Sequence, residues 1–150
     1  MQKILTSLGV LFVAAMLFAS CEGPMGPAGK DSSKMILDYK IPKSAWQPVY
    51  DNNNLFLYYQ CFIKEPELTS EIYNNGGMVA YLEVNEGGVM VQKMLPYIIV
   101  GEDNLGTYSW YIDCDYTVGE IGFYIKNSVF LEELPYMSSG TMNFRVIYLW

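Results

Sequence analysis

The 150-residue chain contains no histidine. Histidine is the commonest general base and metal ligand in proteins, and it completes the Ser-His and Cys-His pairs that activate nucleophiles. Its absence excludes those arrangements. The sequence therefore predicts a protein that is not an enzyme and that holds neither a metal ion nor another cofactor.

Basic residues are also few and dispersed. The chain has 9 Lys and Arg against 16 Asp and Glu, which gives a net charge of −7, and the lysines from Lys30 to Lys126 stand singly. Binding to phosphate backbones or to anionic lipid headgroups depends on clustered Lys and Arg. We therefore expect no nucleic-acid partner, and we attribute the acidity to solubility.

One long uncharged run occurs in the chain, at its N-terminus. It extends over 15 residues from Ile4 to Phe18 and follows Lys3. A membrane-spanning helix needs about 20 apolar residues, so this run is too short for a permanent span. Its length, its basic flank and the small residues after it are typical of a signal peptide. We therefore expect residues 1–20 to be an export signal.

The residues that close this run carry a resemblance to a known family. The segment Leu17-Phe18-Ala19-Ser20-Cys21 resembles the lipobox of bacterial lipoproteins, with Phe18 where the family usually has Leu. The resemblance implies cleavage before Cys21 and attachment of a diacylglyceryl group to its thiol, with a further acyl chain on the freed amine. It also implies a protein anchored by lipid to the outer membrane, facing the periplasm or the cell surface.

The competing interpretation is ordinary secretion, with Cys21 as a spare thiol. The anchor itself is physically sufficient. Each buried methylene contributes about 0.8 kcal/mol, so two or three acyl chains on one residue would make release negligible.

Residues 21–33 form a predicted tether. Gly23 to Asp31 spells three Gly-X-Y triplets with Pro in two of the X positions, which is a collagen-like pattern, but it stops at Ser32. Three triplets are too few for a stable triple helix, so we favour a semi-stiff spacer of about 3.1 Å per residue.

A lipobox followed by such a Gly-Pro stub also resembles a group of small lipoproteins from Bacteroidetes. That resemblance implies a compact β-rich domain with no assigned reaction. Four further segments share it: Leu68 to Gly76, Val79 to Leu82, Met94 to Tyr97 and Asn143 to Ile147.

Residues 34–150 form the predicted domain, in which apolar residues alternate with polar ones. Alternation with period two predicts half-buried strands. We expect strands over residues 35–41, 55–63, 78–84, 89–94, 98–100, 107–116, 120–126 and 141–149, with one short helix over 67–73. Seven or eight short strands favour an antiparallel β-sandwich, and a small β-barrel is the alternative.

Two cysteines lie in predicted strands of this domain, Cys61 and Cys114. Outside the cytoplasm they can form a disulfide. The alternative, which we favour, is two separate buried thiols that pack as small hydrophobic side chains.

Several acidic groups also invite a chemical interpretation. Asp113 and Asp115 share one strand face, as paired carboxylates of a glycosidase could, although a solvated strand face explains them more simply. The segments Asp51 to Asn54 and Glu102 to Asn104 contain oxygen ligands that suit calcium, but ordinary turn chemistry explains both.

Aromatic side chains are the strongest functional indication, with 13 Tyr and 3 Trp. In the adjacent pairs Tyr58-Tyr59 and Trp110-Tyr111, the two rings must face opposite sides of a strand. One ring of each pair then reaches an outer face, where it can stack on sugars or anchor a protein, unless loops cover it. Trp46, Trp110 and Tyr111 are the candidate ligand-binding residues.

These observations predict a membrane-anchored lipoprotein that binds glycan or protein without catalysing a reaction. A structural or adhesive component of the cell surface is the alternative.

Overall fold

The computed structural model describes residues 33–103, 106–135 and 140–150. The predicted signal peptide, Cys21 and all but the last residue of the predicted tether lie outside the described residues, so they stay predictions. Among the described residues, no helix has both the length and the apolar character that crossing a membrane requires.

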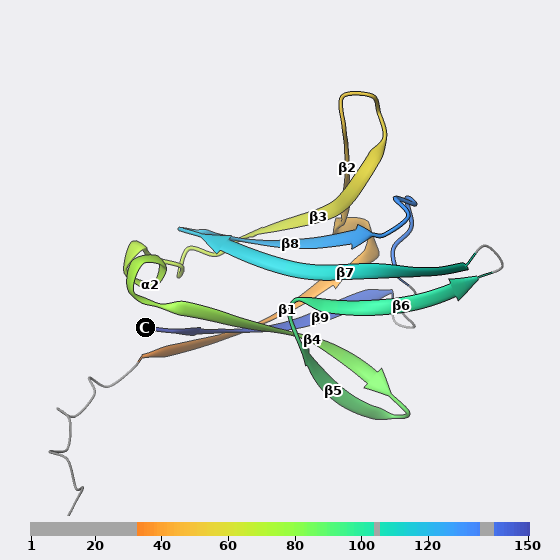
Figure 1. Cartoon of the computed structure of the whole chain (residues 1–150). Helices are drawn as coiled ribbons and strands as arrows, with labels where there is room; N and C mark the ends of the chain where they lie inside the picture. The colour runs from red at the N-terminus through yellow and green to blue at the C-terminus, as the bar shows by residue number, and fades with distance from the viewer. Residues whose placement is uncertain (1–32, 104–105, 136–139) are drawn as a thin grey trace, which may run out of the picture. The chain divides into compact units, whose positions relative to one another are not determined.

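The described residues form two antiparallel sheets, as the sequence predicts. In spatial order, the strands of the first sheet are β1 (Lys34–Pro42), β9 (Thr141–Leu149), β4 (Gly77–Glu86) and β5 (Val89–Met94). Those of the second are β2 (Gln47–Tyr50), β3 (Phe56–Lys64), β8 (Glu120–Asn127), β7 (Gly106–Thr117) and β6 (Tyr97–Asp103). The sheets lie one above the other and do not close into a barrel, which confirms the β-sandwich (Figure 1).

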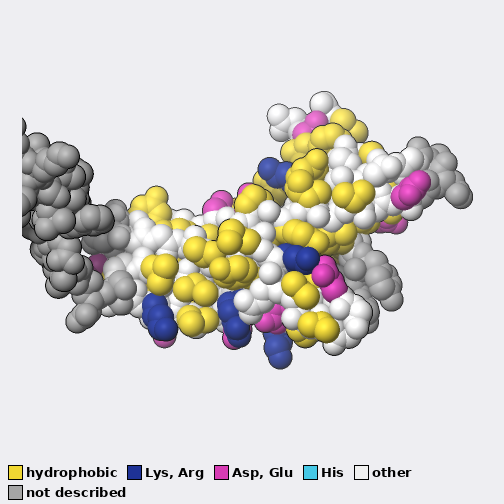
Figure 2. Space-filling model, turned by 60° about the horizontal axis from the view of Figure 1, so that its bottom comes forward, with side chains coloured by type: hydrophobic (Ala, Val, Ile, Leu, Met, Phe, Trp, Pro, Cys, Tyr) yellow, Lys and Arg dark blue, Asp and Glu magenta, His cyan; other side chains and the backbone are white. Residues whose placement is uncertain are grey.

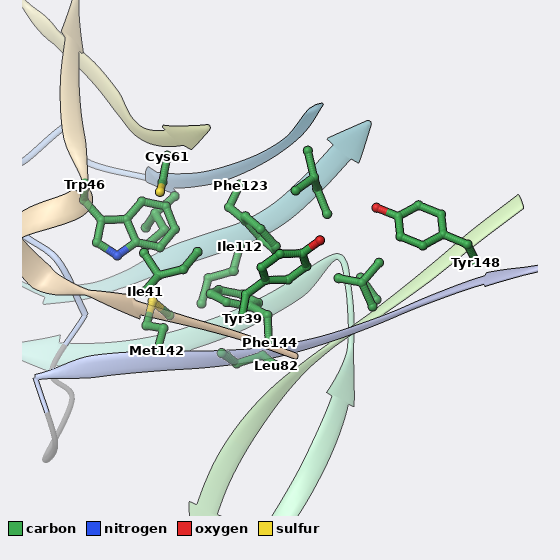
Figure 3. Close-up of a cluster of buried hydrophobic side chains, with 14 of the residues drawn as sticks. Tyr39, Ile41, Trp46, Cys61, Leu82, Ile112, Phe123, Met142, Phe144 and Tyr148 are labelled. Atoms are coloured by element: carbon green, nitrogen blue, oxygen red, sulfur yellow. The ribbon is translucent and has the colours of Figure 1, made fainter. Parts of the chain in front are cut away.

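The core lies between the two sheets because alternate residues of each strand point inward. In β8, for example, Ile121, Phe123 and Ile125 are buried. Figure 3 shows Phe123 beside Phe144, and their ring centroids are 4.5 Å apart. Each fully buried side chain of this kind contributes about 1.5–3 kcal/mol. The most buried side chains are Ile41, Leu68, Ile112, Ile121, Phe123, Ile125, Phe144, Val146 and Tyr148.

A tight turn joins β4 and β5 into a hairpin. Gly87 and Gly88 connect the strands with φ values of 62° and 92°, a backbone conformation that favours glycine. The side-chain oxygen of Asn85 accepts a hydrogen bond from the backbone N–H of Gly88 at 2.9 Å. The turn thereby fixes the register of the two strands.

The helix begins later than the sequence suggests. The structure has α2 over Ser70–Asn75, where we expected residues 67–73. The side chain of Thr69 accepts a hydrogen bond from the backbone N–H of Ile72 and caps the helix, and Leu68 is buried just before it.

The sequence also misses two elements that precede β3, the 3-10 turn η1 (Lys43–Ala45) and strand β2. Strand β2 has four residues, includes Pro48 and shows no alternation. It exists because β3 pairs with it, so it depends on a partner rather than on its own pattern.

Candidate functional site

The outer face of the five-stranded sheet carries a groove of about 520 Å³. We call it the tyrosine groove. It is lined by Tyr58, Pro96, Tyr111, Asp113, Asp115, Tyr124 and Lys126. Apart from Pro96, these side chains come from three adjacent strands, β3, β8 and β7. A sheet of paired strands holds them in fixed positions.

Strand register brings the groove residues together. Between β7 and β8, Tyr111 lies opposite Lys126 and Asp113 lies opposite Tyr124. Adjacent strands are about 4.8 Å apart, so these outward side chains are direct neighbours. The sequence separates them by more than ten positions, and the β7–β8 hairpin brings them into contact.

The rings in and beside the groove pack edge to face. The centroid of Tyr124 lies 6.1 Å from that of Tyr58 and 6.0 Å from that of Phe62, with interplanar angles of 67° and 85°. The ammonium nitrogen of Lys126 lies 5.7 Å from the centroid of Tyr58. Such ring pairs and cation–π contacts are favourable geometries, and they restrict the motion of the side chains.

Tyr124 is fixed at its hydroxyl as well. The hydroxyl donates a hydrogen bond to Oδ1 of Asp115 at 3.1 Å. Partial burial, with this hydrogen bond and the negative charge of Asp115, raises the pKa of Tyr124 to about 12. At neutral pH Tyr124 is therefore a neutral hydrogen-bond donor.

Gly122 makes this contact possible. It lies between Phe62 and Asp115 in the register of the sheet. A Cβ atom at this position would lie 2.6 Å from the hydroxyl oxygen of Tyr124 and 2.8 Å from Oδ1 of Asp115. The missing side chain therefore leaves room for the Tyr124 side chain to lie over Gly122 and for its hydroxyl to reach Asp115 on β7.

The two aspartates of the groove are exposed to solvent, as expected for a solvated strand face. Oδ1 of Asp113 accepts a hydrogen bond from the backbone N–H of Cys114 at 2.8 Å. Neither aspartate belongs to the ion pairs found among the described residues, which are Lys93–Glu86 and Arg145–Asp38. Both carboxylates thus keep free acceptor capacity.

The predicted opposition of adjacent rings is confirmed, and one candidate binding residue lies in the groove. Tyr59 and Trp110 pack in the core, whereas Tyr58 and Tyr111 line the outer groove. Tyr111 is 45% exposed.

The prediction that Trp46 and Trp110 offer exposed rings is wrong, since they are 5% and 7% exposed. Trp46 packs against Phe144 with their centroids 6.4 Å apart. Trp110 points inward with Ile112, and its indole N–H donates to the backbone oxygen of Glu133 at 3.2 Å. It also lies at a second hollow, of about 510 Å³, but with so little exposed surface it cannot offer a ring face for stacking.

The sequence points to Tyr58 only as one ring of an adjacent pair, and it does not single out Tyr124 or Lys126, which also line the groove. A signal for Tyr124 and Lys126 was present in the alternation of β8, where Ile121, Phe123 and Ile125 are the apolar set. The even-numbered residues must then face outward. The position of Tyr58 next to them depends on the pairing of β3 with β8, which the sequence does not reveal.

The outer face of the four-stranded sheet has a different character. That sheet is the lower layer in Figure 1, and Figure 2 brings its side of the molecule forward. Hydrophobic side chains there are interrupted by Lys and Arg (Figure 2). The ion pair between Arg145 and Asp38 joins β9 to β1 on this sheet. The ring cluster belongs to the other sheet.

Cys61 and Cys114 are both free, which confirms separate thiols, and the alternative disulfide is not formed. Both lie opposite Phe123, one on each side of β8. Two strand spacings separate their Cα atoms by about 10 Å, beyond the limit of about 7 Å for a disulfide.

The Asn-rich turn is explained by local hydrogen bonds. Oδ1 of Asp51 accepts from the backbone N–H groups of Asn53 and Leu55, each at 2.8 Å. In the described part of the chain, no three or more Cys, Asp or Glu side chains gather closely enough to hold a metal ion.

Comparisons with protein-family models, with curated proteins and with solved structures found no match to this chain. The groove and its chemistry are therefore the basis for a functional proposal.

We expect both thiols to react slowly in the folded protein. Burial raises the pKa of each, that of Cys114 to about 12, with a contribution from the charges of Asp113 and Asp115. A raised pKa favours the thiol over the reactive thiolate, and it favours folding below the thiol's ordinary pKa. This stabilisation is lost as the pH rises towards 12.

Alkylation of the two thiols by iodoacetamide, measured by peptide mass spectrometry at a series of pH values, should therefore be much slower in the folded protein than after unfolding in urea. Equal rates in the two states would contradict this expectation.

Proposed function

We propose that this chain is a non-enzymatic glycan-binding protein that uses the tyrosine groove, and that lipid on Cys21 holds it on the outer side of a bacterial membrane. The observation that supports binding is the combination of rings, carboxylates and one ammonium group in an open groove on a rigid sheet. The anchor is supported by the lipobox-like residues before Cys21.

The chemistry of the groove suits a sugar. A pyranose ring has an apolar C–H face and a rim of hydroxyl groups. Tyr111, which is 45% exposed, offers an accessible ring to the C–H face, and Asp113 can accept hydrogen bonds from the hydroxyl groups. Lys126 supplies hydrogen-bond donors beside them. Both parts of a sugar thus find complementary groups within one groove.

Rigidity of the groove favours binding further. Paired strands hold the backbone of the groove, and Tyr58 and Tyr124 already contact each other edge to face. Because few side chains then have to be immobilised by a ligand, the entropy cost of binding is small. An open groove without deep enclosure fits an extended oligosaccharide better than a small buried molecule.

Tyr111 is the most exposed ring of the groove. We expect Tyr111→Ala to weaken glycan binding by about tenfold, because about 1.4 kcal/mol of stacking would be lost. A glycan array on the purified protein would find the ligand, and isothermal titration calorimetry would measure the affinity. Trp46 and Trp110 are buried, so their fluorescence would be a poor reporter of a ligand in the groove.

Tyr73→Ala is the matched control. Tyr73 is 49% exposed, but it lies on α2 and packs against Tyr116, away from the groove residues. Its replacement should leave affinity unchanged. Absence of binding to every glycan on the array would overturn the proposal, and so would equal losses in the two variants.

The proposed membrane anchor depends on the thiol of Cys21. In cells that make Cys21→Ala, we expect the protein to leave the membrane fraction, because the acylated thiol and its fatty chains would be missing. Fractionation followed by immunoblotting would measure this. Membrane retention equal to that of the unchanged chain would show that Cys21 is not the anchor.

A structural or adhesive role remains a second candidate because of one edge strand. Strand β6 is at the edge of the five-stranded sheet, and it carries no charge from Tyr97 to Gly101. The other three edge strands carry protecting residues, which are Lys40 in β1, Pro48 in β2 and Lys93 in β5. An unprotected edge can accept a strand from a second copy.

Val100→Lys separates the two candidate functions. Val100 is 65% exposed on β6, so a lysine there should not disturb the core, but it should block pairing at the edge. If the protein assembles through β6, light scattering should show an oligomer that Val100→Lys converts to monomer. If the tyrosine groove alone is the functional surface, the unchanged protein should be monomeric and the variant should keep its affinity for glycan.

A further inference from the structure

We infer that the tyrosine groove selects its glycans by charge, taking neutral and amino sugars and rejecting sugars that carry carboxylate or sulfate. This inference rests on the proposed function, since it names the class of glycan that the same groove would bind. The observations that support it are the positions and hydrogen bonds of its charged groups.

Two carboxylates of the groove face solvent from a single strand. Asp113 and Asp115 are two residues apart on β7, a spacing of about 7 Å, and both are exposed. One oxygen of each is already used: Oδ1 of Asp113 accepts from the N–H of Cys114, and Oδ1 of Asp115 accepts from the hydroxyl of Tyr124. Within the described residues, neither Oδ2 atom has a hydrogen-bond donor, so each remains available to a ligand.

Lys126 does not neutralise these carboxylates. Its ammonium nitrogen lies 5.7 Å from the ring centroid of Tyr58, and among the described residues it forms no ion pair. The groove therefore has two negative groups against one positive group. The net charge of the whole chain, −7, has the same sign.

This charge distribution discriminates between sugars. An ionised carboxylate only accepts hydrogen bonds, so Asp113 and Asp115 need a ligand that donates. Sugar hydroxyl and ammonium groups donate, whereas a uronate or sulfate group replaces a donor with a negative charge. That charge would repel the aspartates at short range, and because both aspartates are exposed, added salt would screen this repulsion in part. Repulsion of the wrong ligand is an effective source of specificity.

Gly122 is a positioning residue for this selection. The space above it lets the Tyr124 hydroxyl reach Oδ1 of Asp115, and this contact fixes the orientation of the carboxylate. An added methyl group would push both side chains away from their present contact. Gly122→Ala should therefore change which sugars bind, although it removes no group that contacts a ligand.

The experiment uses the full chain and a glycan array that contains neutral, amino, uronic-acid and sulfated oligosaccharides. Calorimetry then compares matched pairs, β-1,4-linked cello-oligosaccharide with β-1,4-linked oligoglucuronate, and α-1,4-linked galacto-oligosaccharide with oligogalacturonate, together with chitosan oligosaccharide. We expect the binders to be neutral or amino sugars, with each uronate at least about tenfold weaker than its neutral counterpart. Added salt should strengthen uronate binding and leave neutral binding nearly unchanged.

The variants test whether the two aspartates cause the selection. Asp113→Asn combined with Asp115→Asn keeps the shape of both side chains and removes their charge. The gap in affinity between neutral and uronate sugars, measured as a ratio, should therefore shrink about tenfold. Glu71→Gln removes one exposed charge from α2, away from the groove, and should leave the gap unchanged. Circular dichroism would establish that the variants fold.

Each outcome has a distinct meaning. Uronate or sulfated sugars that bind as tightly as neutral ones would overturn the charge selection and leave glycan binding standing. An unchanged gap in the double variant would show that the aspartates do not cause it, and this too would overturn the inference. If no sugar binds, the proposed function fails and the inference fails with it.

Discussion

The alternation of side chains along the strands is the constraint on which the rest of this structure depends. In β8, Ile121, Phe123 and Ile125 point into the core, so Gly122, Tyr124 and Lys126 must point out. One segment of eight residues therefore builds both the centre of the core and the centre of the groove. A shift of register by one residue would exchange the two sets and destroy both at once.

The same constraint explains why the outer rings are held so firmly. Tyr58 directly precedes the core residue Tyr59, and Tyr111 directly follows the core residue Trp110. Their backbone positions are therefore fixed by packing on the opposite side of the sheet. Deforming the groove would require a deformation of the core, which is close-packed and resists it.

Much of the fold was predictable because it depends on local patterns. Polar and apolar residues alternate from Thr141 to Val146, and the Gly87-Gly88 turn has the residues that a two-residue hairpin needs. Strand β2 was not predictable, because four residues that include Pro48 acquire their structure from β3. The sequence favours a sandwich over a barrel only through the number and length of its strands, since closure of a barrel depends on pairing between distant strands.

The candidate site was predictable only in part, for a related reason. Adjacent rings had to face opposite ways, and alternation along β7 settles which one is inside: Asp113 and Asp115 share the face of Tyr111, so Trp110 points into the core. The choice of Trp110 as a binding residue missed this signal. The neighbourhood of Tyr58 and Tyr124 requires β3 to lie beside β8, although more than fifty residues separate the two rings in the chain. Alternation gives the direction of a side chain, and only the order of strands gives its neighbours.

An open groove of this kind is suited to a protein held at a surface. A glycan bound there would stay partly solvated, so the affinity of one site is expected to be low even with a tenfold contribution from Tyr111. Many copies fixed to one membrane could engage a repetitive polymer together, and the second contact would then form at a high effective concentration. If Cys21 carries the anchor, a tether such as residues 21–33 would extend the reach of each groove while the sheet keeps its geometry. Weak, rigid sites would therefore suit a lipid anchor, because many anchored copies would offset the low affinity of each groove.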